Sequence, residues 1–137
     1  MNVAIYKEVQ IDASHRLLYY KGKCANLHGH RWKVEVWISG EPDATTQILI
    51  DYNLIKLTIG KYDHQIILNR DDPMVTCIEK FQYVITTNGD PTSELLAAVI
   101  RDDLYAVCRE QGITATITKI RVWESPNSFA ELVDEDR

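Results

Sequence analysis

Three of the four histidines in this chain lie within sixteen residues of one another, between His15 and His30. His28 and His30 are two residues apart, and side chains at positions i and i+2 of a β-strand point to the same face of the sheet. The alternation of apolar and polar residues continues through residues 32–38, with the apolar ones on the histidine face. We therefore expect a half-buried strand that opens with two imidazoles on its apolar side.

Two neighbouring imidazoles, with a third from His15, provide the ligands of a tetrahedral zinc site that keeps one position open for chemistry. A strand histidine on its own is most often a hydrogen-bonded core residue, so the pair alone does not identify a metal site. A structural zinc site usually has paired arms such as C-x2-4-C, and the cysteines Cys24, Cys77 and Cys108 form no such arm. The pattern therefore predicts a catalytic rather than a structural Zn²⁺ site.

Cys24 lies four residues before His28, in the segment that connects the first two predicted strands. Three neutral imidazoles would leave the charge of the zinc ion uncompensated, and such an ion acidifies bound hydroxyl groups and neighbouring C–H bonds. A thiol close to a dication loses its proton near neutral pH and can act as a base or nucleophile. The sequence leaves open whether Cys24 is such a base, a fourth zinc ligand or an ordinary loop thiol.

Asp63 and His64 form a second candidate pair for proton transfer. A histidine can exchange protons near neutral pH, and a neighbouring carboxylate can orient it or stabilise its charged form. The alternative is a turn at the end of a helix in which both side chains are solvated.

Glu124 is a candidate substrate-binding residue. It shares a predicted strand face with Ile120 and Val122, and it places a carboxylate at the end of that face. A carboxylate at the mouth of a site can hold the N–H and NH2 edge of a heterocycle through two hydrogen bonds. The alternative is the polar end of a strand.

Composition and charge limit the class of protein. The 137 residues are most consistent with one domain, 1–137, and 45% of them are hydrophobic and 26% charged. The net charge of −5, without a basic run, argues against nucleic acid or an anionic membrane as the partner. No signal peptide is evident, and no apolar stretch approaches the roughly 20 residues of a membrane helix. Three cysteines without framework spacing favour a reducing, cytoplasmic location.

The alternation of apolar residues predicts four strands, over residues 3–14, 28–39, 114–123 and 128–133, with a further extended stretch at 83–87. Cap signatures predict helices after Asp51, after Asp72 to about residue 81, and after Asp90 to Gly112. Strands joined by short turns favour antiparallel pairing with the helices on one face. We therefore expect an α+β fold with a four-stranded antiparallel sheet and two main helices.

An ordered set of motifs resembles one known family. DASHRL (12–17), CANLHGH (24–30), IDYNLIK (50–56), YDHQIILN (62–69), DPTSELLA (90–97) and WESPN (123–127) follow one another as in 6-pyruvoyltetrahydropterin synthases. They also resemble the 6-carboxytetrahydropterin synthases of the queuosine and 7-deazaguanine pathway. The Cys-x3-His spacing from Cys24 to His28 is similar to that of the carboxy branch.

The resemblance implies the tunnelling fold, in which three subunits close their sheets into a β-barrel and two trimers stack into a homo-hexamer with sites between subunits. It implies the conversion of 7,8-dihydroneopterin triphosphate to 6-carboxy-5,6,7,8-tetrahydropterin, acetaldehyde and triphosphate. The alternatives are the pyruvoyl product from the same pterin triphosphate, a non-catalytic zinc- or pterin-binding protein, and a metal hydrolase. The sequence departs from the family pattern at Tyr62 and Leu95, where leucine and asparagine are common.

The resemblance also assigns roles to particular residues. The zinc ligands are His15, His28 and His30. Cys24 is the catalytic base, Asp63 and His64 are the proton relay, and Glu124 is the carboxylate that anchors the pterin. Thr92 and Ser93 line the pterin pocket at a helix N-terminus. Arg16, Lys21 and Lys23 are weaker candidates for contacts with the triphosphate.

Overall fold

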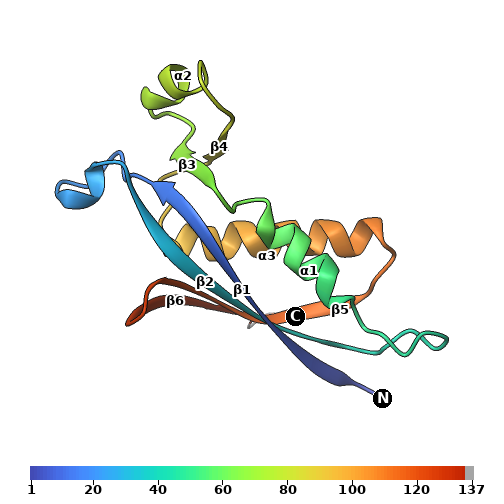
Figure 1. The fold of residues 1–137 in the computed structure, drawn as a ribbon. Helices are drawn as coiled ribbons and strands as arrows, with labels where there is room; N and C mark the ends of the chain where they lie inside the picture. The colour runs from blue at the N-terminus through green and yellow to red at the C-terminus, as the bar shows by residue number, and fades with distance from the viewer. Residues whose placement is uncertain (135–137) are drawn as a thin grey trace.

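The computed structural model describes residues 1–134, in which a curved six-stranded sheet packs against two main helices (Figure 1). The strands are β1 (Val3–His15), β2 (His28–Gly40), β3 (Gln65–Asn69), β4 (Val84–Thr87), β5 (Ala115–Ser125) and β6 (Ser128–Val133). The helices are α1 (Tyr52–Gly60), α2 (Met74–Ile78) and α3 (Ser93–Glu110), with a short 3-10 helix at Lys23–Ala25. None of these helices in the described residues is long and apolar enough to span a membrane.

The expectation of a four-stranded antiparallel sheet was wrong in strand number and in direction. The order is β4-β3-β1-β2-β5-β6, and β3 pairs in parallel with both β1 and β4. Strand β3 reads QIILN, and its last three residues are buried. A strand covered on both faces loses the alternation of polar and apolar residues, which is the signal by which the other strands were predicted.

Helix α1 begins where the sequence predicted. The side chain of Asp51 accepts a hydrogen bond from the backbone N–H of Asn53 and caps the helix. Helix α2 also follows Asp72, whose carboxylate accepts from the N–H of Met74, but it ends at Ile78 rather than near residue 81.

The N-terminus of α3 lies two residues later than predicted, because Thr92 rather than Asp90 caps it. The Thr92 side chain accepts a hydrogen bond from the N–H of Leu95 at 3.1 Å. The carboxylate of Asp90 instead binds a distant loop, described below. At the other end Gly112 has a φ of 67°, the left-handed conformation expected of the residue that follows a helix.

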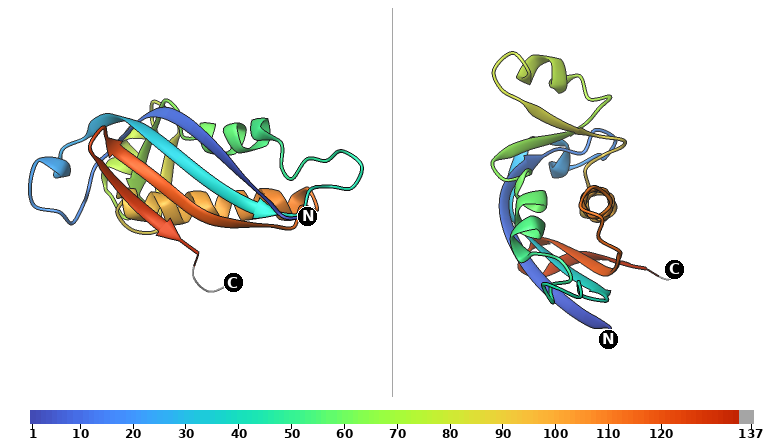
Figure 2. Two further views of the ribbon diagram at one scale, coloured as in Figure 1. Left: turned by 90° about the horizontal axis from the view of Figure 1, so that it is seen from below. Right: turned by 90° about the vertical axis from the view of Figure 1, so that its right-hand side faces the viewer.

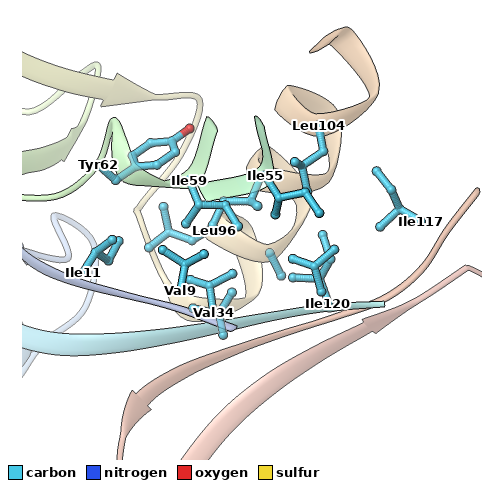
Figure 3. Packing of buried hydrophobic residues seen from close by; sticks show 14 of the residues in the cluster. Val9, Ile11, Val34, Ile55, Ile59, Tyr62, Leu96, Leu104, Ile117 and Ile120 are labelled. Atoms are coloured by element: carbon cyan, nitrogen blue, oxygen red, sulfur yellow. The ribbon is translucent and has the colours of Figure 1, made fainter. Parts of the chain in front are cut away.

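The hydrophobic core lies between the concave face of the sheet and helices α1 and α3, which cover the same face (Figure 2). Ile55 and Ile59 of α1 and Leu104 of α3 pack over Val34 and Ile120 of the sheet, and all five are almost fully buried (Figure 3). Burial of each such side chain contributes about 1.5–3 kcal/mol to folding. The prediction that the helices lie on one face is confirmed.

The other face of the sheet carries charged and aromatic side chains. The carboxylate of Glu35 accepts hydrogen bonds from the Tyr6 hydroxyl and the Trp123 indole N–H, each at 2.5 Å. Burial raises the pKa of Glu35, but these two hydrogen bonds and the charges of Lys33 and Arg121 together hold the pKa below its usual value. The pKa of Tyr6 rises to about 12, through burial and through its bond to Glu35.

Candidate metal centre

The register of β1 and β2 brings three histidines together at one end of the sheet. His15, the last residue of β1, pairs with His28, the first of β2, and Ala13 pairs with His30. The three ring centroids lie 4.7–5.2 Å apart. Each histidine offers a ring nitrogen and Glu124 offers a carboxylate oxygen, and these four atoms all lie within 4.8 Å of one another.

Hydrogen bonds to backbone carbonyls fix two of the rings. The Nδ1 atom of His15 lies 2.7 Å from the carbonyl oxygen of Pro91, and Nδ1 of His28 lies 2.6 Å from that of Asn26. A proton on Nδ1 leaves the lone pair on Nε2, which is the arrangement found around metal-binding histidines.

The Nε2 atoms of His15 and His30 are buried and make no hydrogen bond. Nε2 of His30 does lie 3.1 Å from Oε1 of Glu124, a distance suited to an ion pair, but the geometry is not that of a hydrogen bond. Buried polar atoms normally have hydrogen-bond partners, so two buried ring nitrogens that lack one, in a cluster of possible ligand atoms, fit a metal ion. A donor set of imidazoles and one carboxylate suits zinc better than magnesium or calcium.

The electrostatics favour neutral rings at the centre of this cluster. Burial lowers the pKa of His15, and the neighbouring imidazoles lower it further against the opposing effects of Pro91 and Glu124. Burial also lowers the pKa of His30. Both rings are therefore neutral at pH 7, which is the form that binds a metal ion.

Glu124 lies beside the histidines, a contact that was not predicted from the sequence. Its Oε1 atom is 3.1 Å from Nε2 of His30 and 3.9 Å from Nε2 of His15. The side chain also lines a cavity of about 520 Å³, together with Lys33 and Trp123. The carboxylate therefore stands between the histidine cluster and an open space, where it can contact either a metal ion or a bound molecule.

Cys24 lies in the loop that joins His15 to His28, within the short 3-10 helix, and is half-buried. Its carbonyl oxygen accepts a hydrogen bond from the N–H of Leu17 at 2.9 Å. Among the described residues, the cluster of possible metal ligands does not include its thiol. Cys24 is therefore close to the cluster in the sequence, but its thiol is not one of the possible metal ligands.

Asp63 and His64 lie in the turn between α1 and β3, and their side chains meet, with Nδ1 of His64 3.0 Å from Oδ2 of Asp63. Neighbouring side chains rarely meet, and His64 here has a φ of 62°, an uncommon left-handed conformation for a residue other than glycine. Asp12 holds the turn, since its N–H donates to Oδ1 of Asp63 and its carbonyl oxygen accepts from the N–H of His64. These contacts, with that from Asp12 foremost, hold the pKa of Asp63 below its usual range.

The ring of His64 is largely exposed and borders a cavity of about 500 Å³. His30 and Arg31 line the same cavity, and they also line the cavity beside Glu124. His30 and Arg31 therefore border both spaces.

Thr92 and Ser93 lie at the N-terminus of α3. Thr92 caps the helix, and the buried Ser93 donates a hydrogen bond from its hydroxyl to Glu94. The link between this segment and the cluster is the carbonyl oxygen of the preceding Pro91, which contacts His15. Sequence reasoning missed Pro91, because any residue type can present a backbone carbonyl.

Arg16, a candidate for triphosphate binding, forms an ion pair with Asp72. Its Nε and Nη2 atoms donate to the carboxylate of Asp72 at 2.6 and 2.7 Å. Lys21 and Lys23 are exposed in the loop after Arg16, and their role stays a prediction.

The sequence is similar to a family of pterin enzymes. Residues 4–135 match the family model described as 6-pyruvoyl tetrahydropterin synthase. The 6-carboxy-5,6,7,8-tetrahydropterin synthase of Haemophilus influenzae is 33% identical over 142 residues, which covers 93% of this chain and 96% of that protein. The synthase of the same name from Rickettsia conorii is 30% identical over 135 residues, covering 92% and 96%.

The fold is shared with solved structures of more distant sequence. The 6-pyruvoyl tetrahydropterin synthase of Caenorhabditis elegans superposes with a TM-score of 0.67 at 22% identity, covering 98% of this chain and 97% of that one. An uncharacterized protein of Wolinella succinogenes superposes with a TM-score of 0.78 at 20% identity, covering 98% and 99%.

Proposed function

Because the chain belongs to the 6-pyruvoyl tetrahydropterin synthase family, we propose that it is a zinc-dependent lyase that acts on a pterin triphosphate. The substrate is 7,8-dihydroneopterin triphosphate, and the products are 6-carboxy-5,6,7,8-tetrahydropterin, acetaldehyde and triphosphate. The observation that carries the proposal is the group of three imidazoles, two of which have a buried Nε2 atom that makes no hydrogen bond. The names of the sequence relatives and the Cys24-x3-His28 spacing support the carboxy product.

His15, His28 and His30 would hold the zinc ion through their ring nitrogens. When bound, such an ion supplies Lewis acidity, which acidifies hydroxyl groups and adjacent C–H bonds. Cys24 takes a proton from the activated carbon of the substrate at its Sγ atom. The location of the thiol in the loop between two ligands, yet outside the ligand cluster, supports a role as base.

His64 returns protons to the substrate at a second position. Asp63 engages Nδ1 of His64 at 3.0 Å, so Nε2 is left to exchange protons with a bound molecule. The cavity that His64 shares with His30 supports this assignment, since both rings then border the same substrate.

Glu124 anchors the pterin ring by accepting hydrogen bonds from its N–H and NH2 groups. Its place beside the cavity of about 520 Å³ supports this role. Thr92 and Ser93 would line the other side of the ring, near the N-terminus of α3. The proximity of Glu124 to His30 also makes it a candidate fourth ligand when no substrate is bound.

We propose that the enzyme is a cytoplasmic homo-hexamer formed by two stacked trimers. In the described chain β4 and β6 are the edges of the sheet, and exposed edges are usually covered or closed into a barrel. The three cysteines are free thiols, which supports a reducing compartment.

The test is incubation of the purified protein with 7,8-dihydroneopterin triphosphate, followed by mass spectrometry of the pterin products. We expect 6-carboxytetrahydropterin together with acetaldehyde. Detection of the 6-pyruvoyl compound would assign the alternative activity, which the description of the matched family favours. Binding of substrate and zinc without turnover would identify a non-catalytic pterin-binding protein.

A further inference from the structure

The loop of residues 16–27 begins directly after His15 and ends directly before His28, so both of its ends are fixed by the histidine cluster. Cys24 lies in the later part of this loop. A loop outside the sheet can adopt many conformations unless other contacts hold it. The position of the Cys24 thiol therefore depends on the contacts that hold the loop against the rest of the protein.

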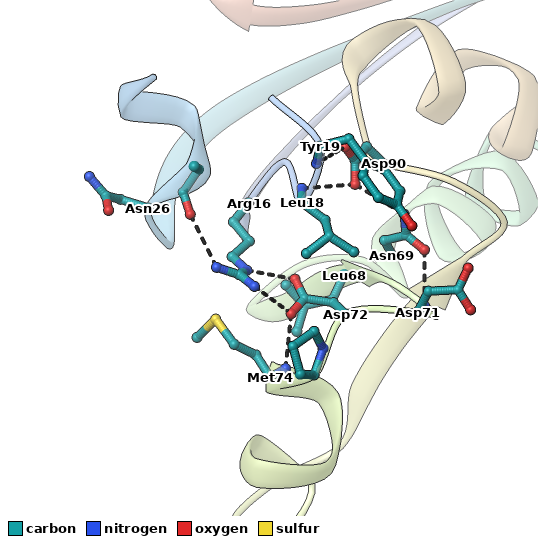
Figure 4. A network of polar contacts seen from close by, with 12 residues as sticks. Arg16, Leu18, Tyr19, Asn26, Leu68, Asn69, Asp71, Asp72, Met74 and Asp90 are labelled. Carbon is teal, nitrogen blue, oxygen red and sulfur yellow. Dashed lines mark hydrogen bonds and ion pairs between the residues drawn. The ribbon is translucent and has the colours of Figure 1, made fainter. Parts of the chain in front are cut away.

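Arg16 joins this loop to the rest of the fold through its side chain (Figure 4). Its guanidinium donates two parallel hydrogen bonds to the carboxylate of Asp72, at 2.6 and 2.7 Å. A third N–H, from Nη1, donates to the carbonyl oxygen of Ala25 at 3.4 Å. One guanidinium thus joins Asp72 to the residue that follows Cys24.

Asp72 is a firm anchor for this guanidinium. Its side chain is fully buried, and it also accepts a hydrogen bond from the N–H of Met74 at 2.9 Å, at the start of α2. A planar guanidinium bound by two parallel hydrogen bonds has a fixed orientation, which a lysine ammonium in the same place would lack. Nothing in the proposed chemistry requires a buried ion pair at this position.

Asp90 holds the first part of the same loop. Its two carboxylate oxygens accept hydrogen bonds from the N–H groups of Leu18 and Tyr19, both at 2.9 Å, and Asn69 donates to it at 3.1 Å (Figure 4). The next residue, Pro91, presents its carbonyl oxygen to His15. The loop and the histidine cluster therefore both form hydrogen bonds with the same segment, residues 90–91.

We propose that Arg16 and Asp72 are a positioning pair that fixes the conformation of the loop that carries Cys24. The pair acts through the backbone at Ala25 and does not touch the substrate. This inference rests on the proposed function, in which the Cys24 thiol takes a proton from the substrate.

Two sets of substitutions test the pair. Arg16→Met combined with Asp72→Leu removes both charges together, which buried ion pairs commonly tolerate better than the loss of one partner. Arg16→Lys keeps the charge but cannot form two parallel bonds. The matched control is Arg101→Met with Asp102→Leu, which removes an exposed ion pair on α3. All variants carry Cys77→Ser, because Cys77 is exposed and Cys108 is buried.

The first measurement is the rate at which iodoacetamide alkylates Cys24 in the absence of substrate, followed by mass spectrometry. Release of the loop should raise this rate about tenfold in the double variant and less in Arg16→Lys, because alkylation reports local opening. The second measurement is turnover of dihydroneopterin triphosphate. We expect kcat to fall by about 10²-fold through misplacement of the thiol, with KM and zinc content close to those of the parent.

Alkylation rates and kcat equal to those of the parent in both positioning variants would overturn the proposal. Loss of zinc along with activity would also overturn it, since the pair would then support the metal site rather than the thiol. If the double variant does not fold, Arg16→Lys decides the outcome alone. If the parent itself shows no turnover, the proposed function fails, while the alkylation rates still test the pair.

Discussion

The Nδ1 atom of His15 lies 2.7 Å from the carbonyl oxygen of Pro91, a residue 76 positions further along the chain. This contact joins the end of β1 to the segment that precedes α3. It also selects the ring tautomer that leaves Nε2 of His15 for a metal ion. The orientation of one candidate ligand therefore depends on the correct docking of α3.

The histidine cluster predicts about one zinc ion per chain. His28→Ala should remove both the metal and the activity, because two imidazoles and a carboxylate are a weaker site. Elemental analysis of the purified proteins measures the metal, and His64→Ala is the control that should retain it. Protein without stoichiometric metal that stays active in excess chelator would contradict the assignment.

Cys24→Ala should keep zinc and substrate affinity but lower kcat by about 10²-fold or more, the usual scale for the loss of a general base. Steady-state kinetics and metal analysis on the same preparation check both parts. A Cys24→Ala protein that has lost its metal would show instead that the thiol is a zinc ligand.

Glu124→Ala should weaken substrate binding while zinc stays in place. The carboxylate has one 3.1 Å contact with His30, whereas the anchoring of a pterin would use both of its oxygens. Isothermal titration with a pterin measures the first effect, and competition with a chelator measures the second. A fall in zinc affinity by about 10-fold or more would identify Glu124 as a ligand.

Asp72 should make the stability of the fold depend on acid pH. The hydrogen bonds from Arg16 hold the pKa of Asp72 below its ordinary value of 3.8. A lowered folded-state pKa stabilises the protein above the unfolded-state pKa, and this stabilisation is lost as the pH falls through the folded-state value.

We therefore expect Asp72→Asn to cost about 2 kcal/mol of unfolding free energy at pH 7, the typical worth of a charged hydrogen bond. The difference from the parent should shrink below about pH 4. Urea unfolding of the chelator-treated proteins from pH 7 to below about pH 4 measures this difference in unfolding free energy. A difference that is constant with pH would contradict the assigned ion pair.

The edges of the sheet predict a symmetric oligomer, with a hexamer expected from the proposed assembly. Multi-angle light scattering, run with an activity assay across a dilution series, checks the mass of the active species. An active monomer at low concentration would argue against sites formed between subunits.

The sequence predicted the histidine cluster because it depends on alternation and register alone. His28, His30 and Trp32 share a face in any strand, and antiparallel pairing with β1 brings His15 opposite His28. The helix caps were predicted where the capping residue had no other partner, as at Asp51. At Asp90 the prediction was wrong, because a loop 71 residues away occupies its carboxylate.

The parts that sequence reasoning missed depend on contacts between distant segments. Strand β3 has no alternation because it is buried, so its parallel pairing was not visible. Arg16 was considered as a phosphate contact, since a single arginine does not reveal its partner 56 residues later. The contact of Pro91 was missed because it is made by the backbone carbonyl, which every residue type has.

The two hydrogen bonds that Asp12 makes to Asp63 and His64 also restrict which insertions and deletions the chain can accept. His15 and the turn of Asp63 and His64 are both fixed to β1, with only residues 13 and 14 between their attachment points. One added residue there would turn His15 to the outer face of the sheet, or shift the turn out of reach of its cavity. This four-residue stretch of β1, from residue 12 to residue 15, should therefore keep its length wherever the chemistry is kept.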